Sequence, residues 1–316
     1  MAGRRSPTQG TLREAAEALR GLLAAVDAGE LDVATPREVA LLRRLFGVSV
    51  GSAEPAIPSG LATILGAMES RLERVAPYYR ENLSLVHHQG FGFHADACAP
   101  GIVRLLEPVR QHEGLVVEIG CGSGRLTTYL VDAGFRVVAT DASESMLNLA
   151  RTHVPGGAEI RRLTLPHDPI LPADAIVGVG HALNYLDDES QVEEALVAMA
   201  TSLRPGGIMA IDLCDLEWGA ARVNQPPQVW RTEDWALMTE FSVPESNRYV
   251  RIMTTFVRQK DGTWRRDDER HDNVLIETST IPELLALHGV EATVSAAFGD
   301  EQMPVGLVAV IGRRAK

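Results

Sequence analysis

A run of small residues, Gly120-Cys121-Gly122-Ser123-Gly124, follows a short apolar stretch that carries one carboxylate, Glu118. Glycine lets the main chain approach a ligand closely, and the start of a following helix offers N–H groups to that ligand. A second carboxylate, Asp141, ends the next apolar stretch, 17 residues beyond Gly124. A right-handed crossover places Asp141 at the neighbouring strand tip, where it can accept hydrogen bonds from two ribose hydroxyls. The spacing therefore indicates a site for a nucleoside-containing cofactor.

Four further side chains could accept a proton from a substrate. His181 and Tyr185 lie in GVGHALNYL (178–186), which follows a predicted strand, and Glu269 and His271 are two residues apart on another. Two residues separated in this way share one face of a strand. For His181 a polar contact to a cofactor without proton transfer stays open. For His271 a solvated hairpin face stays open.

Aromatic and histidine side chains gather in residues 77–100, ahead of the glycine run. They are Tyr78, Tyr79, His87, His88, Phe91, Phe93 and His94, in a chain with only 5% aromatic residues. This segment could form a lid over a pocket for a planar or apolar substrate, or a helix whose aromatic side chains pack on a sheet. We expect no metal, because no cysteine or carboxylate arrangement supports the three histidines as ligands.

The elements that position these residues alternate in kind. Apolar runs at 115–120, 135–140, 175–180 and 207–212 are separated by helix-length segments, which predicts an α/β fold with a parallel sheet covered on both faces. Residues 228–278 are predicted to form several longer β-segments joined by hairpin-like turns. A short helix and two apolar strands, predicted as an antiparallel pair, end the chain.

Residues 1–75 are expected to form a helical N-terminal extension, followed by the main domain over 76–316. Leucine and alanine recur at helical spacing within 11–29, and Thr35-Pro36 resembles a helix start. Two or three short helices bury little surface by themselves. We expect them to dock on the main domain or to form a homodimer with a second copy.

The charge balance excludes some partners. With 30 basic and 42 acidic residues the net charge is −12 and the pI about 5.3, the wrong sign for a uniform nucleic-acid or anionic-membrane surface. Cys98, Cys121 and Cys214 lack metal-ligand spacing and are expected to be buried thiols. No apolar run is long enough to span a bilayer and no signal peptide is evident, so a cytoplasmic protein is expected.

Taken together, EIGCGSG (118–124) resembles the first motif of the class I S-adenosylmethionine-dependent methyltransferases, with Asp141 as the ribose-binding acid. LRPGG (203–207) resembles the family's turn before the fifth strand, and the final strand pair fits its reversed seventh strand. The resemblance implies a Rossmann-like seven-stranded sheet and S-adenosyl-L-methionine as cofactor, with S-adenosyl-L-homocysteine as product. It assigns these residues to the cofactor: Glu118, Gly120, Cys121, Gly122, Ser123, Gly124, Asp141, Ala142, Met146, Thr164, Leu165 and Gly180. Thr164 and Leu165 stand where an Asp commonly meets adenine, and His167-Asp168 is an alternative.

GVGHALNYL resembles the corresponding stretch of glycine N-methyltransferase-like and amino-sugar N-methyltransferases. The resemblance implies a substrate site lined by Tyr78, Tyr79, His88, Phe91, Phe93, Asn184 and Trp218. It also implies that the β-rich insertion at about 218–276 caps this site. Trp218, Trp230, Trp235 and Tyr249 are the candidate wall residues.

The expected reaction is methyl transfer to a nitrogen or oxygen of a small metabolite, with carbon less favoured, by in-line displacement in a capped pocket. The likeness to amino-sugar enzymes suggests natural-product biosynthesis. The base is expected among His181, Tyr185, His271 and Glu269. Three alternatives stay open: a cofactor-binding scaffold of the same fold that catalyses another reaction, a protein-modifying methyltransferase, and a dinucleotide oxidoreductase.

Overall fold

The computed structural model describes residues 78–316. The predicted helices of residues 1–75, and the homodimer expected to form through them, lie outside the described residues. The described part divides into two compact units. The smaller unit contains residues 78–86, 227–240 and 252–270, and the larger one contains 87–226, 241–251 and 271–316. The units are therefore interleaved along the chain.

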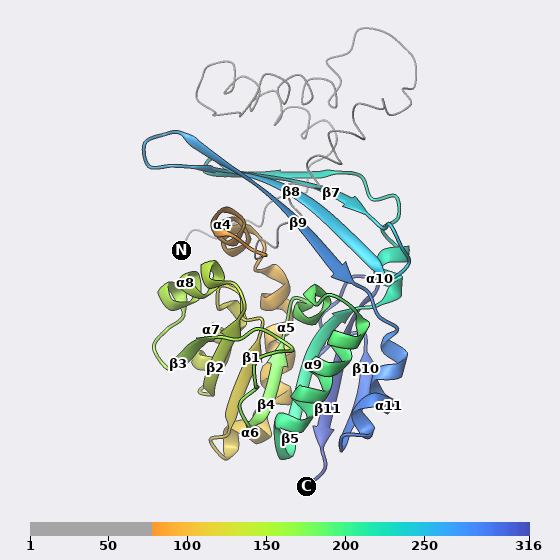
Figure 1. The fold of residues 1–316 in the computed structure, drawn as a ribbon. Helices are drawn as coiled ribbons and strands as arrows, with labels where there is room; N and C mark the ends of the chain where they lie inside the picture. The colour runs from red at the N-terminus through yellow and green to blue at the C-terminus, as the bar shows by residue number, and fades with distance from the viewer. Residues whose placement is uncertain (1–77) are drawn as a thin grey trace. The chain divides into compact units, whose positions relative to one another are not determined.

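The larger unit is built on a seven-stranded sheet with the order β10-β11-β5-β4-β1-β2-β3 (Figure 1). The strands are β1 (Leu115–Ile119), β2 (Arg136–Asp141), β3 (Ala158–Arg162), β4 (Ala173–Gly178), β5 (Leu203–Cys214), β10 (Val290–Ser295) and β11 (Leu307–Arg314). The pairs of β1 with β2 and β4, of β2 with β3 and of β4 with β5 are parallel, whereas β11 runs antiparallel to both β5 and β10. The predicted Rossmann-like sheet with its reversed last strand is confirmed.

Helices cover both faces of this sheet. Side chains of α5, α6, α7 and α8 join one apolar cluster, and side chains of α9 and α11 join another. Neighbouring β1 residues, Val116 and Val117, enter opposite clusters because side chains alternate along a strand. The helices are α5 (Phe93–Leu105), α6 (Glu107–Gln111), α7 (Arg125–Asp132), α8 (Glu144–His153), α9 (Glu189–Ser202) and α11 (Ile281–Ala286).

A second, four-stranded sheet has the order β6-β7-β8-β9. Its strands are β6 (Gln228–Arg231), β7 (Trp235–Ser242), β8 (Arg248–Arg258) and β9 (Trp264–Val274). It confirms the antiparallel insertion after β5. Residues 229–241, whose sequence predicts one long β-segment, are split into β6 and β7. The Thr232 hydroxyl accepts hydrogen bonds from the main-chain N–H groups of Asp234 and Trp235 and makes a tight turn between the two strands.

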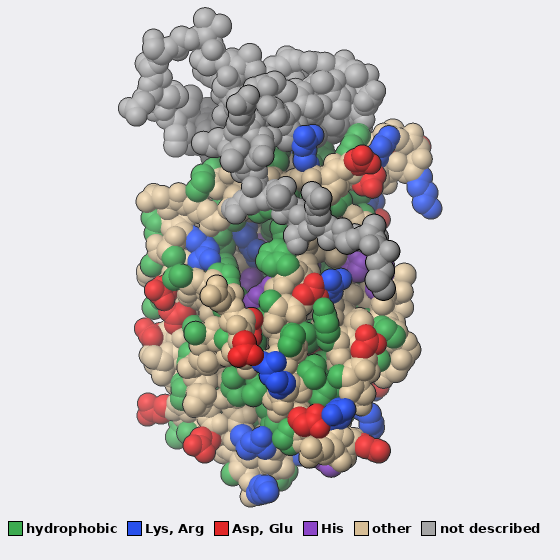
Figure 2. All heavy atoms as spheres, turned by 180° about the vertical axis from the view of Figure 1, so that it is seen from behind, with side chains coloured by type: hydrophobic (Ala, Val, Ile, Leu, Met, Phe, Trp, Pro, Cys, Tyr) green, Lys and Arg blue, Asp and Glu red, His purple; other side chains and the backbone are tan. Residues whose placement is uncertain are grey.

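The remaining elements are short. They are α4 (Glu81–Gly90), α10 (Leu216–Ala220) and the 3-10 turns η1 (Ala182–Tyr185) and η2 (Thr278–Thr280). Within residues 78–316, no helix has the length and apolar character to cross a membrane. On the face shown in Figure 2, acidic and basic side chains of the described residues are interspersed.

Candidate active site

The glycine loop lies between β1 and α7, at the carboxyl end of the parallel strands. Gly120, Gly122 and Gly124 all have positive φ angles, of 68°, 54° and 83°, which side chains strongly disfavour. A methyl carbon built on Gly120 would lie 2.4 Å from the Ala182 Cβ atom. The loop therefore touches the η1 turn after β4. Gly122 is less closely packed, because the nearest atom to a methyl carbon built on it would be the Met146 sulfur at 3.9 Å.

Asp141, at the end of β2, is joined to this loop. Its Oδ2 atom accepts a hydrogen bond from the Gly122 N–H at 2.9 Å, and its Oδ1 atom accepts one from the Ser143 N–H at 2.8 Å. Burial raises the pKa of Asp141, and these two hydrogen bonds oppose that rise. The predicted ribose-binding acid thus lies beside the predicted cofactor loop.

Glu118 lies deeper, with 2% of its surface exposed. It accepts a hydrogen bond from the Thr127 hydroxyl at 2.7 Å, and burial raises its pKa to about 7. Cys121 is also buried, and burial raises its pKa well above the usual value, as expected for an unreactive thiol.

The other predicted cofactor residues lie on the next two connections of the sheet. Ala142 is exposed, whereas Met146 is buried in the first turn of α8. Thr164 donates its N–H to the Asp168 carboxylate at 2.7 Å, which closes a turn after β3. Leu165 packs against the apolar cluster that includes side chains of α9 and α11.

The residues after β4 form a sharp turn, here called the reaction turn (Gly180–His181). Gly180 has a φ of 101° and His181 a φ of 48°. The carboxylate of Asp212, on the neighbouring strand β5, accepts hydrogen bonds from both N–H groups, at 2.9 Å and 2.6 Å. His94 of α5 places its Nε2 atom 2.6 Å from the same carboxylate. No sequence pattern indicates this role of Asp212, although it lies in an apolar strand run that ends near the site.

Aromatic and basic side chains surround His181 within the larger unit. The Tyr185 ring stacks on the His181 ring, with centroids 5.7 Å apart and an angle of 9° between the planes. The Tyr185 hydroxyl lies 3.3 Å from the His271 Nδ1 atom and accepts a hydrogen bond from Arg251. Burial and then the charge of Arg251 lower the pKa of His181 to about 3. His181 is therefore a neutral imidazole near pH 7.

Trp218 completes this group. Its ring centroid lies 6.0 Å from that of His181, and Tyr249 contacts it edge-on at 6.0 Å. The Nδ1 atom of His181 and the Nε1 atom of Trp218 are buried and form no hydrogen bond with the described residues. Buried polar atoms are nearly always satisfied in native proteins, so this pair marks a place where a ligand group can bind.

The histidine-rich segment before β1 contacts the cofactor loop. The His88 Nδ1 atom lies 2.9 Å from the Ser123 hydroxyl, and the His88 ring packs on His153 with centroids 4.0 Å apart. Phe91 lies 6.4 Å from Phe93, ring to ring, and Phe93 is 56% exposed. His88 therefore borders the cofactor loop, whereas Phe93 faces solvent.

Asn184, a predicted substrate contact, forms hydrogen bonds to the main chain of two strands. Its amide nitrogen donates to the main-chain oxygens of Cys214 and Val274, and its amide oxygen accepts from the Cys214 N–H. Its side chain is fully buried. These bonds occupy both polar atoms, and they tie η1 to β5 and β9.

Glu269, Tyr78 and Tyr79 belong to the smaller unit. The two carboxylate oxygens of Glu269 accept hydrogen bonds from the N–H groups of Tyr79 and Arg80, at 2.7 Å and 2.9 Å. Glu269 thus holds the main chain of this segment, and its role as a base stays a prediction. The candidate wall residues divide in the same way, because Trp230 and Trp235 lie in the smaller unit and Trp218 and Tyr249 in the larger one.

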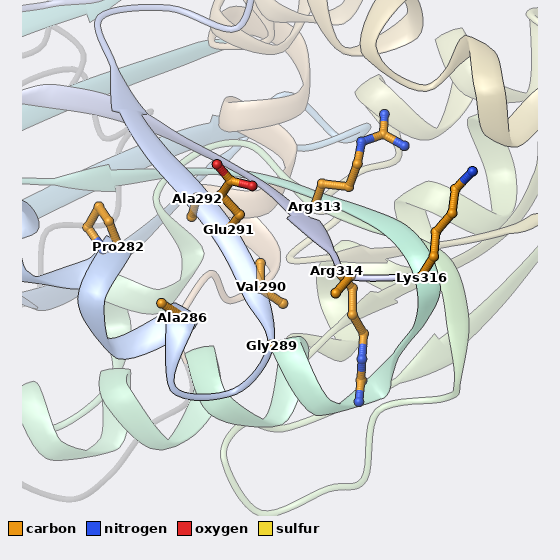
Figure 3. A pocket seen from close by; sticks show the side chains of 10 residues that line it. Pro282, Ala286, Gly289, Val290, Glu291, Ala292, Arg313, Arg314 and Lys316 are labelled. Atoms are coloured by element: carbon orange, nitrogen blue, oxygen red, sulfur yellow. The ribbon is translucent and has the colours of Figure 1, made fainter.

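A surface hollow of about 580 Å³ lies elsewhere, between α11, the start of β10 and the end of β11 (Figure 3). Because β11 runs antiparallel to β5, this hollow is at the amino end of the parallel strands. It contains none of the predicted site residues. Among residues 78–316, no group of three or more His, Cys, Asp or Glu side chains could hold a metal ion.

The carboxyl-end site fits an adenosyl cofactor. Gly180 leaves open space where a side chain would lie, since nothing is within 4 Å of a methyl carbon built on it. Asp141 stands at the adjacent strand tip. Residues 116–207 match the methyltransferase domain family, which spans the glycine loop, Asp141 and the reaction turn. Residues 116–207 therefore form a class I S-adenosylmethionine-dependent methyltransferase domain. S-adenosylmethionine is accordingly its cofactor.

Known methyltransferases resemble this one in sequence and in fold. A glycine N-methyltransferase of Mus musculus is 33% identical over 182 residues, which are 51% of this chain and 62% of that enzyme. The structure of the sugar N-methyltransferase KedS8 from Streptoalloteichus sp. ATCC 53650 is 17% identical, with a TM-score of 0.62 over 85% of this chain and 100% of the other. A methyltransferase from Clostridium acetobutylicum ATCC 824 is 14% identical, with a TM-score of 0.59 over 81% and 100%. These two structures show the shared fold.

Proposed function

We propose that this methyltransferase transfers a methyl group to a nitrogen or oxygen of a small metabolite, with carbon a less favoured acceptor. The observation that supports this most directly is the contact between the cofactor loop and the turn that carries His181. A methyl carbon built on Gly120 would collide with the Ala182 Cβ atom, so the turn packs directly against the loop. An acceptor bound against His181 and Trp218 would be close to the bound cofactor.

When bound, S-adenosylmethionine supplies an activated methyl group on a sulfonium. The protein then has to orient the acceptor atom, exclude water and accept a proton where the acceptor carries one. The neutral His181 imidazole has an Nδ1 atom that can accept a hydrogen bond from an acceptor O–H or N–H. Tyr185 stacks on its ring, and His271 in turn contacts the Tyr185 ring edge-on.

The first acceptors to test are amines. A glycine N-methyltransferase and a sugar N-methyltransferase are among the relatives, by sequence and by fold respectively. The purified protein would be incubated with S-adenosylmethionine and a panel of amino sugars, amino acids and hydroxylated sugars. Mass spectrometry would measure S-adenosylhomocysteine and the methylated product.

We expect transfer to at least one small acceptor, with turnover lowered at least tenfold by His181→Ala and less by His271→Gln and Tyr185→Phe. His112→Gln is a matched control, because His112 is an exposed histidine at the amino end of the sheet. Methylation of protein alone would favour a protein-modifying enzyme. Consumption of the cofactor without any methylated product would favour another reaction on the same scaffold.

A further inference from the structure

The reaction turn (Gly180–His181) has a conformation that requires support from outside itself. His181 has a φ of 48°, in the left-handed region that residues other than glycine rarely adopt. Gly180 precedes it with a φ of 101°. Without a specific contact, the chain would relax toward a more common conformation and carry the His181 side chain with it.

One carboxylate provides that contact. Asp212 accepts hydrogen bonds from the Gly180 N–H with Oδ2 and from the His181 N–H with Oδ1. It is 2% exposed and lies on β5, the strand next to β4 in the sheet. Although burial alone would raise its pKa, the hydrogen bond from His94 and the nearby N–H groups lower the pKa of Asp212. The carboxylate is therefore charged, and a charged acceptor binds N–H donors more strongly than a neutral one.

A third donor fixes the carboxylate itself. His94, in the first turn of α5, places Nε2 2.6 Å from Asp212 Oδ2, with 22% of its side chain exposed. Its ring also lies 3.8 Å from the buried Cys98 sulfur. With Gly180 and His94 on one oxygen and His181 on the other, the carboxylate has little freedom to rotate. The turn is thereby connected to helix α5.

We propose that Asp212 and His94 are positioning residues of the methyl-transfer site, in which Asp212 fixes the reaction turn and His94 fixes Asp212. The proposal rests on the proposed function for the role of His181, and on the family's cofactor for the role of Gly180. Neither Asp212 nor His94 needs to touch the reacting atoms.

Asp174 offers a matched control. It is a partly buried carboxylate on β4 that accepts hydrogen bonds from the Leu115 N–H at 2.7 Å and the Arg204 guanidinium at 2.6 Å, with a histidine, His112, at 3.7 Å. It lies at the amino end of the sheet, away from the reaction turn. Asp174→Asn should therefore lower stability as Asp212→Asn does, but leave ligand binding unchanged.

The experiment measures S-adenosylhomocysteine binding by calorimetry for the variants Asp212→Asn, His94→Leu, His94→Gln and Asp174→Asn. Loss of a charge-assisted hydrogen bond at the turn should weaken binding about tenfold in Asp212→Asn and about threefold in His94→Leu. His94→Gln, which keeps a donor near the same place, should restore most of the affinity. Asp174→Asn should bind as the wild type does.

Proton NMR gives a second, structural measurement. An imidazole N–H bonded to a carboxylate resonates downfield, and the His94 signal should disappear in Asp212→Asn and persist in Asp174→Asn. If Asp212→Asn does not fold, His94→Leu and His94→Gln still decide the matter. Wild-type affinity in His94→Leu, or equal losses in His94→Leu and His94→Gln, would overturn the proposal.

Turnover separates this proposal from the proposed function. Where a small acceptor is methylated, Asp212→Asn and His94→Leu should lower kcat more than they raise the KM for that acceptor, because the misplaced group is His181. An absence of methyl transfer in the wild-type protein would count against the proposed function alone. The binding and NMR measurements would still test the two positioning residues.

Discussion

The two buried carboxylates of the cofactor site accept hydrogen bonds from different kinds of donor. Asp141 accepts two main-chain N–H groups, whereas Glu118 accepts one hydroxyl from Thr127. A main-chain donor is fixed by the fold, so Asp141 is held in place before any ligand arrives. Glu118 has fewer bonds to stabilise its charge, which is why burial raises its pKa to about 7.

Replacing Asp141 should weaken cofactor binding. In Asp141→Ala the Gly122 N–H and the ribose hydroxyls both lose the carboxylate that accepts their hydrogen bonds. We therefore expect a loss of about 1.5–3 kcal/mol in binding free energy. Calorimetry with S-adenosylhomocysteine measures this directly. Glu144→Ala is the control, since Glu144 is an exposed carboxylate nearby, paired with Arg151. Unchanged affinity in Asp141→Ala would remove Asp141 from the site.

Glu118 should link binding to pH. The family resemblance places this carboxylate near the cofactor's ammonium group, which favours the ionised form. Near pH 7 we therefore expect S-adenosylhomocysteine binding to release about half a proton. Calorimetry in two buffers of different ionisation enthalpy measures the number released, and Glu118→Gln should reduce it to nearly zero.

The same group sets a dependence of stability on pH. Its pKa in the folded protein lies above the ordinary value of 4.5, so its favourable contribution to stability is fully present below that value. The contribution declines as the pH rises through about 7.

Equal proton release from the wild-type and Glu118→Gln proteins on S-adenosylhomocysteine binding would assign the released proton to another residue.

At the scale of elements, the join between β1 and α7 depends on a glycine that needs both space and a positive φ. A methyl carbon on Gly124 would lie 2.2 Å from Val154 Cγ2, whereas Gly134, with a φ of 85°, has nothing within 4 Å. Gly134→Ala should cost about 1–2 kcal/mol of unfolding free energy. Gly124→Ala should cost about 1–3 kcal/mol more, from overpacking. Urea unfolding measures both, and equal losses would contradict the packing argument.

The sequence predicted the elements better than their side-chain partners. Alternating apolar runs and glycine turns are local patterns, so the parallel sheet, its reversed strand and the cofactor loop could be predicted. The role of Asp212 depends on a turn 31 residues earlier in the chain. Asn184 donates a hydrogen bond to the main-chain oxygen of Val274, 90 residues away. Such pairings follow from strand order and register, which one sequence does not show.

On the scale of the whole molecule, the chain passes between its two compact units several times. Strands β7, β8 and β9 each contain residues of both units. A boundary that crosses strands cannot be recognised from composition, because each strand has one continuous pattern. The sequence could predict that an insertion follows β5, but not this division.

We propose that residues 1–60 mediate self-association, because their predicted helices are amphipathic and too few to form a core. Deleting residues 1–60 should then convert a dimer into a monomer in multi-angle light scattering, while S-adenosylhomocysteine binding is retained. The full-length chain at the same concentration is the control. A molecular mass that corresponds to the same number of subunits before and after deletion would contradict this proposal.

The antiparallel direction of β11 has a practical result. It carries Lys316 to the start of β5, where the main chain of Ala315 forms hydrogen bonds with Gly206 and Gly289. This is the amino end of the parallel strands, whereas the glycine loop lies at their carboxyl end. The chain has only one other lysine, Lys260, in the β8–β9 connection. An amine-reactive dye or a sensor surface coupled at Lys316 would leave the mouth of the cofactor site uncovered. Lys260→Arg would then direct lysine labelling to that single position.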